Sequence, residues 1–177
     1  MTKIAVIYKS NYGSTKKYAQ WISEHLKADL FEQSEVLIDE LDLYNTIIYG
    51  GGLYASGIIG SSFIKNNYEK LKQKQLIVFT VGLAATDDES IFKPIIDKNF
   101  SEKMQSNIKF FHLRGSINYK QLSISHKLLM FLLKTKLSFK DKRSFSIEDK
   151  QFIATYGKLA NFTNQERLKP LLAYVNK

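Results

Sequence analysis

The chain has 177 residues, a length typical of one domain, and its 44% hydrophobic and 24% charged residues exclude wholesale disorder. It contains no cysteine, which excludes disulfides, thiolate nucleophiles, iron–sulfur clusters and cysteine-ligated zinc. Its three histidines, His25, His112 and His126, do not have the spacing of metal ligands, so we expect no metal site.

The net charge of +9 is concentrated in the C-terminal part of the chain. Residues 109–177 hold 14 of the 26 basic residues but only 4 of the 17 acidic ones. This asymmetry predicts an anionic partner (lipid headgroups, nucleic acid or an acidic protein) unless the lysines are simply solvated. No nucleic-acid-binding motif accompanies the charge, so we expect no nucleic-acid partner. No apolar stretch reaches the length of a membrane span, and the N-terminal apolar run is too short for a signal peptide, so we expect a cytoplasmic protein.

Short apolar runs alternate with segments of helical periodicity along the chain. Predicted strands cover residues 3–8, 28–33, 44–49, 76–81 and 108–113, and predicted helices cover 14–27, 63–71, 91–100 and 147–162. The strands are continuously apolar, as is typical of strands buried on both faces. This order predicts an α/β fold, in which residues 1–177 form a single domain with an open five-stranded parallel sheet and helices on both faces. Ligands bind such sheets at the carboxyl ends of the strands.

The first predicted strand is followed at once by the hydroxyl-rich loop Ser10-Asn11-Tyr12-Gly13-Ser14-Thr15 and a helix. Hydroxyl groups and backbone N–H groups at the start of a helix form an anion site, and the glycine lets the main chain approach the ligand. The loop has neither the Gly-Lys-Ser/Thr of nucleotide triphosphate loops nor the G-x-G-x-x-G of dinucleotide sites. The simpler alternative is a turn followed by Ser14 as the N-cap of the helix.

The pattern S-x-x-G-S-T directly after the first strand resembles the FMN phosphate loop of the flavodoxin family. The resemblance implies a flavodoxin-like fold with FMN as its cofactor. The implied cofactor contacts in this loop are Ser10, Asn11, Tyr12, Gly13, Ser14 and Thr15.

A run of three glycines, Gly50, Gly51 and Gly52, follows the third predicted strand and leads into Leu53 and Tyr54. Glycines accept backbone angles that are closed to other residues, which predicts a loop that approaches a planar ligand closely. The run stands where the family's main chain contacts the flavin N5. Tyr54 offers a ring that stacks on the flavin. We therefore expect all five residues to contact the cofactor.

The third loop begins with Gly82, Leu83 and Ala84, which are further expected cofactor contacts, and has no aromatic residue before Ser90. Electron-carrying flavodoxins usually place a second stacking aromatic in this loop. Its absence predicts that one face of the flavin ring is open to a substrate.

Residues 115–145 are predicted to form a long basic and apolar insert after or within the fifth strand. Its central helix, predicted over 122–138, holds six consecutive apolar residues, 128–133, between lysines. Three interpretations stay open: the helix lies in the headgroup plane of a membrane, closes over the flavin as a lid, or packs on the sheet. His126 opens this helix, and of two roles, a cap of the helix or a contact to a carboxylate of a substrate, we expect the cap.

The motif R-G-x-x-x-Y that begins at Arg114, with the helix H-K-L-L-M-F-L-L-K-T, resembles the quinone-dependent protoporphyrinogen dehydrogenases of bacteria, which are flavodoxin-like proteins with such an insert. The resemblance implies oxidation of protoporphyrinogen IX to protoporphyrin IX by hydride transfer to the flavin N5, repeated with reoxidation of the flavin until the macrocycle is aromatic. The electrons would pass to a membrane quinone, with peripheral contact at the inner face of the cell membrane. Because the flavin carries the chemistry, no catalytic side chain is assigned. Arg114, Lys120 and Lys127 are expected to bind the propionates of the substrate.

This chain departs from that subgroup on both sides of the apolar helix. The subgroup often has an Asp-Arg pair before the helix and a glycine pair after it, where this chain has His126-Lys127 and Lys136-Leu137. The main alternative is a flavodoxin-type electron carrier that binds FMN without a substrate of its own. Such carriers are typically acidic around the flavin, whereas the C-terminal part of this chain is basic.

Overall fold

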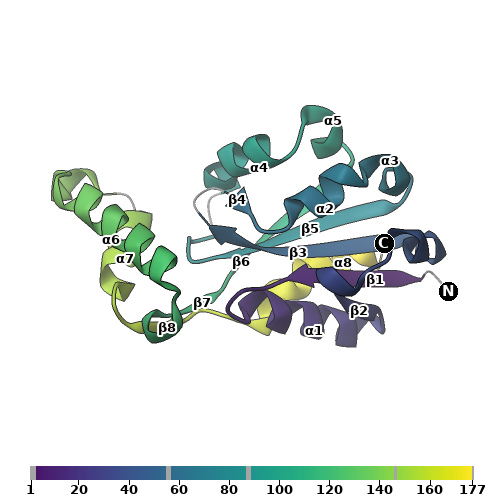
Figure 1. Cartoon of the computed structure of the whole chain (residues 1–177), viewed down its shortest axis with the longest axis horizontal. Helices are drawn as coiled ribbons and strands as arrows, with labels where there is room; N and C mark the ends of the chain where they lie inside the picture. Colours follow the sequence, from purple (N-terminus) through teal and green to yellow (C-terminus); the bar gives the residue numbers. More distant parts are fainter. Residues whose placement is uncertain (1–2, 55–56, 87–88, 146, 177) are drawn as a thin grey trace.

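The computed structural model describes residues 3–54, 57–86, 89–145 and 147–176. Its centre is a sheet of five parallel strands in the order β2-β1-β3-β5-β6, which confirms the predicted α/β fold (Figure 1). The strands are β1 (Ile4–Lys9), β2 (Asp29–Glu32), β3 (Thr46–Tyr54), β5 (Gln75–Gly82) and β6 (Ile108–Arg114), and a short β4 (Gly57–Ile58) pairs antiparallel with the end of β3.

Helices cover both faces of the sheet because successive residues of the central strands are apolar and point to opposite sides. On one face, Ala5 and Ile47 belong to a core completed by α2 (Ser61–Asn66), α3 (Tyr68–Leu71), α4 (Lys93–Asn99) and α5 (Glu102–Gln105). On the other face, Val6, Ile48 and Ile77 pack with α1 (Ser14–Leu26) and α8 (Lys169–Val175). Short 3-10 helices, η1 (Gln33–Glu35), η2 (Ile38–Leu43) and η3 (Glu89–Phe92), lie in the connections.

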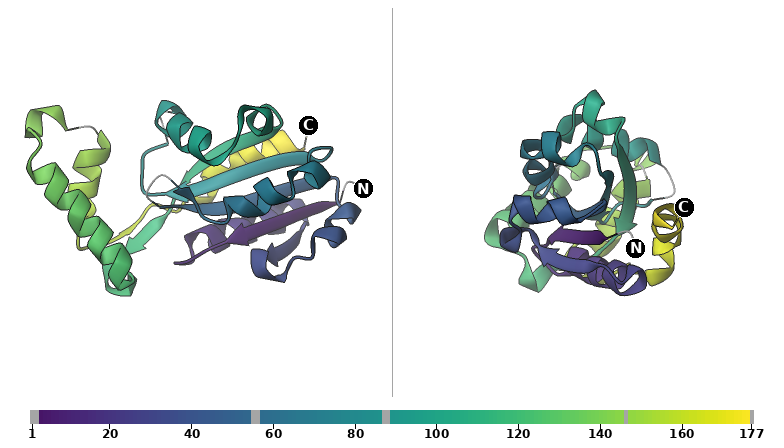
Figure 2. Two further views of the ribbon diagram at one scale, coloured as in Figure 1. Left: turned by 45° about the horizontal axis from the view of Figure 1, so that its top comes forward. Right: turned by 90° about the vertical axis from the view of Figure 1, so that its right-hand side faces the viewer.

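Beyond β6 the chain forms an arm, residues 116–161, which extends past the carboxyl ends of the strands (Figures 1 and 2). The base of the arm is an antiparallel ribbon of β7 (Ser116–Asn118) and β8 (Leu159–Asn161). The arm carries α6 (Ile124–Ser138), α7 (Ile147–Thr155) and the 3-10 helices η4 (Tyr119–Gln121) and η5 (Lys142–Ser144). The chain then returns to the sheet through η6 (Gln165–Leu168) and α8. A helix is therefore present where 122–138 predicts one.

The predicted loop at Gly50, Gly51 and Gly52 is wrong, because all three glycines lie within β3, which continues to Tyr54. A Cβ atom on Gly50 would lie 2.1 Å from Cζ of Phe79 on the neighbouring strand β5. The glycine is needed there because the buried Phe79 ring occupies the space that a side chain would take. It does not serve a turn of the chain.

The predicted last helix, 147–162, is too long. α7 ends at Thr155, Gly157 adopts a left-handed φ of 76°, and the chain then pairs with β7 as β8. The last helix is α8, which sequence reasoning missed. One signal is present in the sequence, since Pro170 stands in the first turn of α8.

His112 lies on β6 with its Nδ1 atom 2.7 Å from Oγ1 of Thr80. Its ring stacks on that of Phe92, with 3.8 Å between the ring centroids. Burial disfavours the charged imidazolium and lowers the pKa of His112 from 6.5 to about 4.

This depressed pKa predicts acid sensitivity of the fold. Between pH 6.5 and about 4 the unfolded chain protonates this histidine and the folded chain does not, so the free energy of unfolding should fall as the pH falls. His112→Gln removes this contribution. Denaturant unfolding across that pH range should show that the free energy of unfolding falls more steeply with pH in the wild type than in the variant. The difference in slope should be at most about 1.4 kcal/mol per pH unit. Equal slopes in the two proteins would contradict the assignment.

Candidate functional site

α1 begins directly at the predicted phosphate loop. Its N-cap is Gly13, with a left-handed φ of 90°, and no side chain caps the helix. The N–H group of Gly13 donates to Oγ of Ser10 at 3.1 Å. The alternative in which Ser14 caps α1 is wrong, because its hydroxyl is 2.8 Å from Oγ of Ser116 and accepts the backbone N–H of Ser116 at 3.0 Å. The backbone N–H groups of the first turn are therefore left for a ligand.

A pocket of about 840 Å³, open to solvent, lies at the carboxyl ends of β1, β3 and β5. Residues from all three predicted loops line it: Ser10, Asn11, Tyr12, Ser14, Thr15, Gly52, Leu53, Tyr54, Gly82 and Leu83. Four other predicted contacts, Gly13, Gly50, Gly51 and Ala84, are not among the lining residues.

Gly52 is the glycine of β3 that shapes this pocket. A Cβ atom there would lie 2.9 Å from Cε2 of Tyr54 and 3.7 Å from Oγ1 of Thr15. Thr15 itself is only 3% exposed, so its hydroxyl is a nearly dry polar group at the pocket wall. Gly52 therefore keeps open the space between the phosphate loop and the Tyr54 ring.

The arm supplies a further wall of the pocket, and its residues there were not among the predicted cofactor contacts. The lining residues from the arm are Ser116, Ile117, Asn118, Leu122, His126, Leu129, Met130 and Leu133, and Val81 on β5 and Gly115 complete the lining. Gly115 directly follows β6 and donates its N–H to the carbonyl of Gly82 at 2.7 Å. Gly115 stands just after the fifth predicted strand, as glycines also do after the third and fourth. This repetition is the sequence signal that could have identified Gly115 as a pocket residue. The face of α6 that carries Leu129, Met130 and Leu133 lies against the cofactor loops.

Three rings meet between the phosphate loop, β3 and α6. The rings of His126 and Tyr54 stack with centroids 4.8 Å apart, and Nδ1 of His126 is 2.5 Å from the Tyr12 hydroxyl. The backbone N–H of Ser123 also donates to the Tyr12 hydroxyl at 3.2 Å. Burial raises the pKa of Tyr54 to about 12, so this phenol stays protonated at neutral pH. The start of α6 is thus tied to the phosphate loop.

His126 is not the cap of α6, which corrects the expectation for this residue. The cap is Ser123, whose hydroxyl accepts the backbone N–H of His126 at 3.3 Å. The imidazole instead reaches Tyr12 and Tyr54 inside the pocket. Its position depends on how the arm folds back at β7, which local sequence periodicity does not report.

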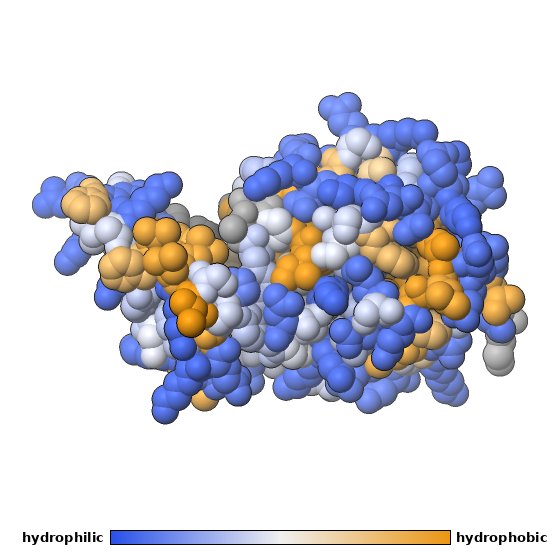
Figure 3. Space-filling view, viewed as in Figure 1, coloured by the Kyte–Doolittle hydropathy of each residue, from blue (hydrophilic) through white to orange (hydrophobic). Residues whose placement is uncertain are grey.

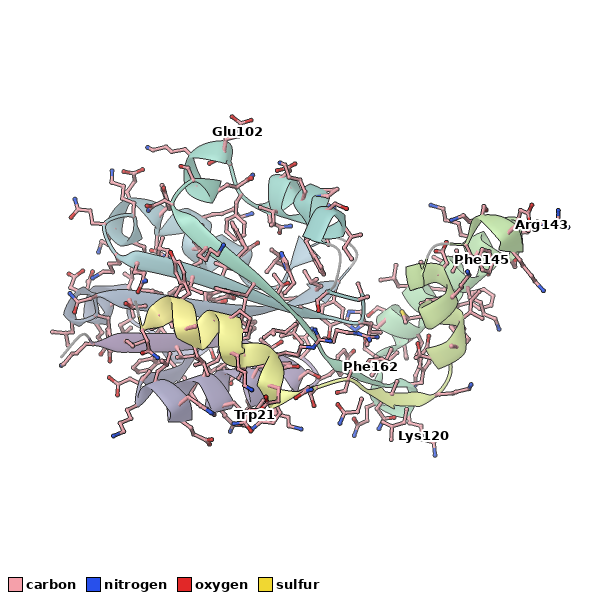
Figure 4. All side chains as sticks on the ribbon, turned by 180° about the vertical axis from the view of Figure 1, so that it is seen from behind. Trp21, Glu102, Lys120, Arg143, Phe145 and Phe162 are labelled. Carbon is pink, nitrogen blue, oxygen red and sulfur yellow. The ribbon has the colours of Figure 1, made fainter. Side chains whose placement is uncertain are left out.

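The three cations expected to bind propionates are not among the residues that line this pocket. Phe162 lies at the junction of arm and sheet (Figure 4). The Arg114 guanidinium lies 3.8 Å from the ring centroid of Phe162, and its Nη2 donates to the carbonyl of Leu83 at 3.3 Å. Lys120, near the base of the arm, and Lys127, on α6, are exposed. Their role toward a substrate stays a prediction.

None of the described residues that line the pocket is Asp, Glu, Lys or Arg. Within the described ranges, no group of three or more histidine or carboxylate side chains is placed to hold a metal ion. Among the helices that the structure describes, none has both the length and the apolarity needed to cross a membrane.

The donor set of the pocket fits a phosphate ester of a flat, apolar ring system. The uncapped first turn of α1 supplies N–H groups and a positive dipole end, and Ser10 and Thr15 add hydroxyl donors beside it. Leu53, Tyr54 and Leu83 supply apolar surface a short way from this end. A phosphate needs no lysine or arginine at such a site, which agrees with the uncharged lining.

Similar folds are found among solved structures. The Trp repressor binding protein from Bacillus subtilis is 20% identical over 66% of this chain and 85% of its own, with a TM-score of 0.49. Flavodoxin 2 from Bacillus cereus is 20% identical over 64% and 84%, with a TM-score of 0.47. A flavodoxin from the domain Archaea is 16% identical over 67% and 87%, with a TM-score of 0.45. No match is found among curated proteins.

The flavodoxin domain family matches residues 5–144, which is most of the chain. This range includes the phosphate loop, the glycine-containing end of β3, the end of β5 and α6. A flavodoxin domain with this phosphate loop indicates FMN as the cofactor. The chain belongs to the flavodoxin family.

Proposed function

We propose that this protein is an FMN-dependent oxidoreductase that oxidises a porphyrinogen, protoporphyrinogen IX, and passes the electrons to a quinone. The single observation that carries the proposal is that the inner face of α6, with Leu129, Met130 and Leu133, lines the same pocket as the FMN loops. An electron carrier needs an accessible flavin edge for its redox partners. A wall of apolar side chains at that place favours a small-molecule substrate instead.

The residues of the chain divide the work of binding between two ends of the pocket. The hydroxyls of Ser10 and Thr15 and the backbone N–H groups of the first turn of α1 would hold the FMN phosphate, while Gly52 and Tyr54 would border the ring. FMN, when bound, supplies the two-electron chemistry, so the protein needs to bind, orient and exclude water. This agrees with a pocket that is lined without carboxylates among its described residues.

The arm has the chemistry expected for a porphyrinogen site. A tetrapyrrole is a large apolar ring with carboxylate tails, and the inner face of α6 offers apolar contacts beside exposed basic residues. Lys127 follows the pocket residue His126 directly, and Lys120 lies in η4 at the start of the arm. We propose that these two lysines bind propionates at the rim of the pocket. Arg114 is less well placed to bind a propionate, because its guanidinium packs on Phe162.

The proposal is tested by an anaerobic assay of protoporphyrinogen oxidation by the FMN-loaded protein, with a short-chain soluble quinone in buffer without lipid. Leu129→Ser/Met130→Ser should raise the KM for the porphyrinogen by about tenfold or more, because apolar contact is lost. Ile153→Ser on α7 is the matched control, since this side chain is 44% exposed and does not line the pocket.

A loaded protein that does not oxidise the porphyrinogen, but exchanges single electrons with a redox protein, would refute the enzyme and favour the carrier. Turnover that is equal in the wild type and in the pocket variant would remove α6 from the substrate site.

A further inference from the structure

α6 presents a second apolar face, which points away from the pocket. We call it the outer stripe and define it by four large apolar residues of the helix, Ile124, Leu128, Phe131 and Leu132, together with the C-cap residue Phe139. They are 87%, 57%, 55%, 55% and 86% exposed. Leu128 stands four residues after Ile124, and Phe131 and Leu132 stand three and four residues after Leu128. This spacing puts the four helical residues on one side of α6, opposite the pocket-lining Leu129, Met130 and Leu133. A hydrophobic patch is visible on the arm (Figure 3).

Such an exposure is costly in water, because each of these side chains would be stabilised by burial. Single exposed leucines are common on protein surfaces, but the outer stripe groups four large residues on one helix face with a fifth, Phe139, at the end of that helix. Neither the sheet nor α7 covers the stripe in the described structure. The face is therefore an unpartnered surface that requires an occupant.

The charge around the outer stripe identifies the kind of occupant. The chain has no acidic residue between Glu102 and Asp141, whereas α6 alone carries Lys127, Lys134 and Lys136. These lysines are exposed and flank the stripe. Lys142 and Arg143 continue the positive charge to the far end of the arm, where Arg143 points outward (Figure 4).

We propose that the outer stripe docks on an anionic lipid bilayer, with α6 lying in the plane of the headgroups. An apolar face flanked by lysines matches this surface on both counts, since the side chains enter the acyl boundary and the ammonium groups meet anionic headgroups. A second copy of the chain is a poorer occupant, because symmetric pairing of two stripes would bring like-charged lysines together.

This docking gives the two faces of α6 different tasks. The outer face rests on the membrane while the inner face lines the pocket. A lipophilic substrate or quinone would then move between the bilayer and the pocket over a distance of about the thickness of one helix. That consequence rests on the proposed function. The docking itself does not, and its test measures no turnover, so the two proposals fail separately.

The test is co-sedimentation of the full chain with sucrose-loaded vesicles of phosphatidylglycerol and phosphatidylcholine, against vesicles of phosphatidylcholine alone. We expect binding to the anionic vesicles that weakens with added salt. Leu128→Ser/Phe131→Ser/Leu132→Ser should weaken this binding by at least about tenfold. Leu37→Ser/Leu43→Ser is the matched control and should bind like the wild type, because these leucines are 65% and 64% exposed in the segment before β3.

A second variant tests the charge independently of the apolar side chains. Lys127→Gln/Lys134→Gln/Lys136→Gln should lower the affinity for anionic vesicles by about fivefold for each lysine. Failure of the wild type to sediment with anionic vesicles, or equal binding by the wild type and the stripe variant, would overturn the proposal. A wild-type dimer in lipid-free light scattering that the stripe variant abolishes would also overturn it and assign the stripe to a second copy.

Discussion

Gly50→Ala is expected to lower the free energy of unfolding by about 2–3 kcal/mol. Its Cβ atom would lie 2.1 Å from Cζ of Phe79 and within 2.7 Å of both Cε atoms. Phe79 is fully buried between the sheet and α1, so its ring has no open space to move into. Gly50 does not have a left-handed φ, so the whole cost is steric. Denaturant unfolding monitored by circular dichroism measures this loss.

The matched control repeats Gly50→Ala in the Phe79→Leu background, in which the side chain that the new methyl group would meet is smaller. Because leucine lacks the ring edge that the new methyl group would meet, Gly50→Ala should cost clearly less in the Phe79→Leu background. Equal costs in the two backgrounds would show that the contact with Phe79 is not the reason for the glycine. The same variants separate two roles of Gly50: a cofactor contact would lower FMN affinity in the folded protein, whereas the packing role leaves it near the wild-type value.

Thr15→Val should weaken FMN binding by about 5- to 150-fold, which corresponds to about 1–3 kcal/mol. Thr15 is nearly buried in the pocket wall in the first turn of α1, so its hydroxyl is placed to donate to a phosphate oxygen. Valine has the same shape and no donor, so the oxygen would lose a partner without a change in packing. Quenching of FMN fluorescence on titration measures the affinity.

Thr15→Ser is the control for this prediction, since it keeps the hydroxyl and removes only a methyl group. We expect its FMN affinity to stay much closer to that of the wild type than to that of Thr15→Val. If the Thr15→Val variant and the wild type bind FMN with equal affinity, Thr15 does not contact the phosphate. If serine and valine weaken binding equally, the methyl packing rather than the hydroxyl is what matters.

The sheet and the convergence of its loops could be predicted because they follow from local patterns. The apolar runs around Val6, Ile48 and Ile77 are long enough to be strands buried on both faces, and parallel strands bring their carboxyl ends to one edge. Ser10, Tyr54 and Leu83 stand at the ends of three strands that are far apart in the sequence, and they line one pocket.

What could not be predicted depends on contacts between distant residues. Three adjacent glycines are typical of a turn, and only the position of Phe79 on the next strand explains why Gly50 belongs inside β3. His126 enters the pocket because β7 and β8 pair and direct α6 toward the cofactor loops. Strands of three residues carry too little periodicity to be recognised before the structure is known.

The central claim is that the loop from Ser10 to the first turn of α1 holds the phosphate of FMN. Its most direct test is the titration of the FMN-free protein with FMN and, separately, with riboflavin, which has the same ring but no phosphate. We expect one FMN per chain, bound at least about a hundredfold more tightly than riboflavin, since two or more charge-assisted hydrogen bonds are lost with the phosphate. Equal affinity for the two flavins, or no binding of either, would contradict the account.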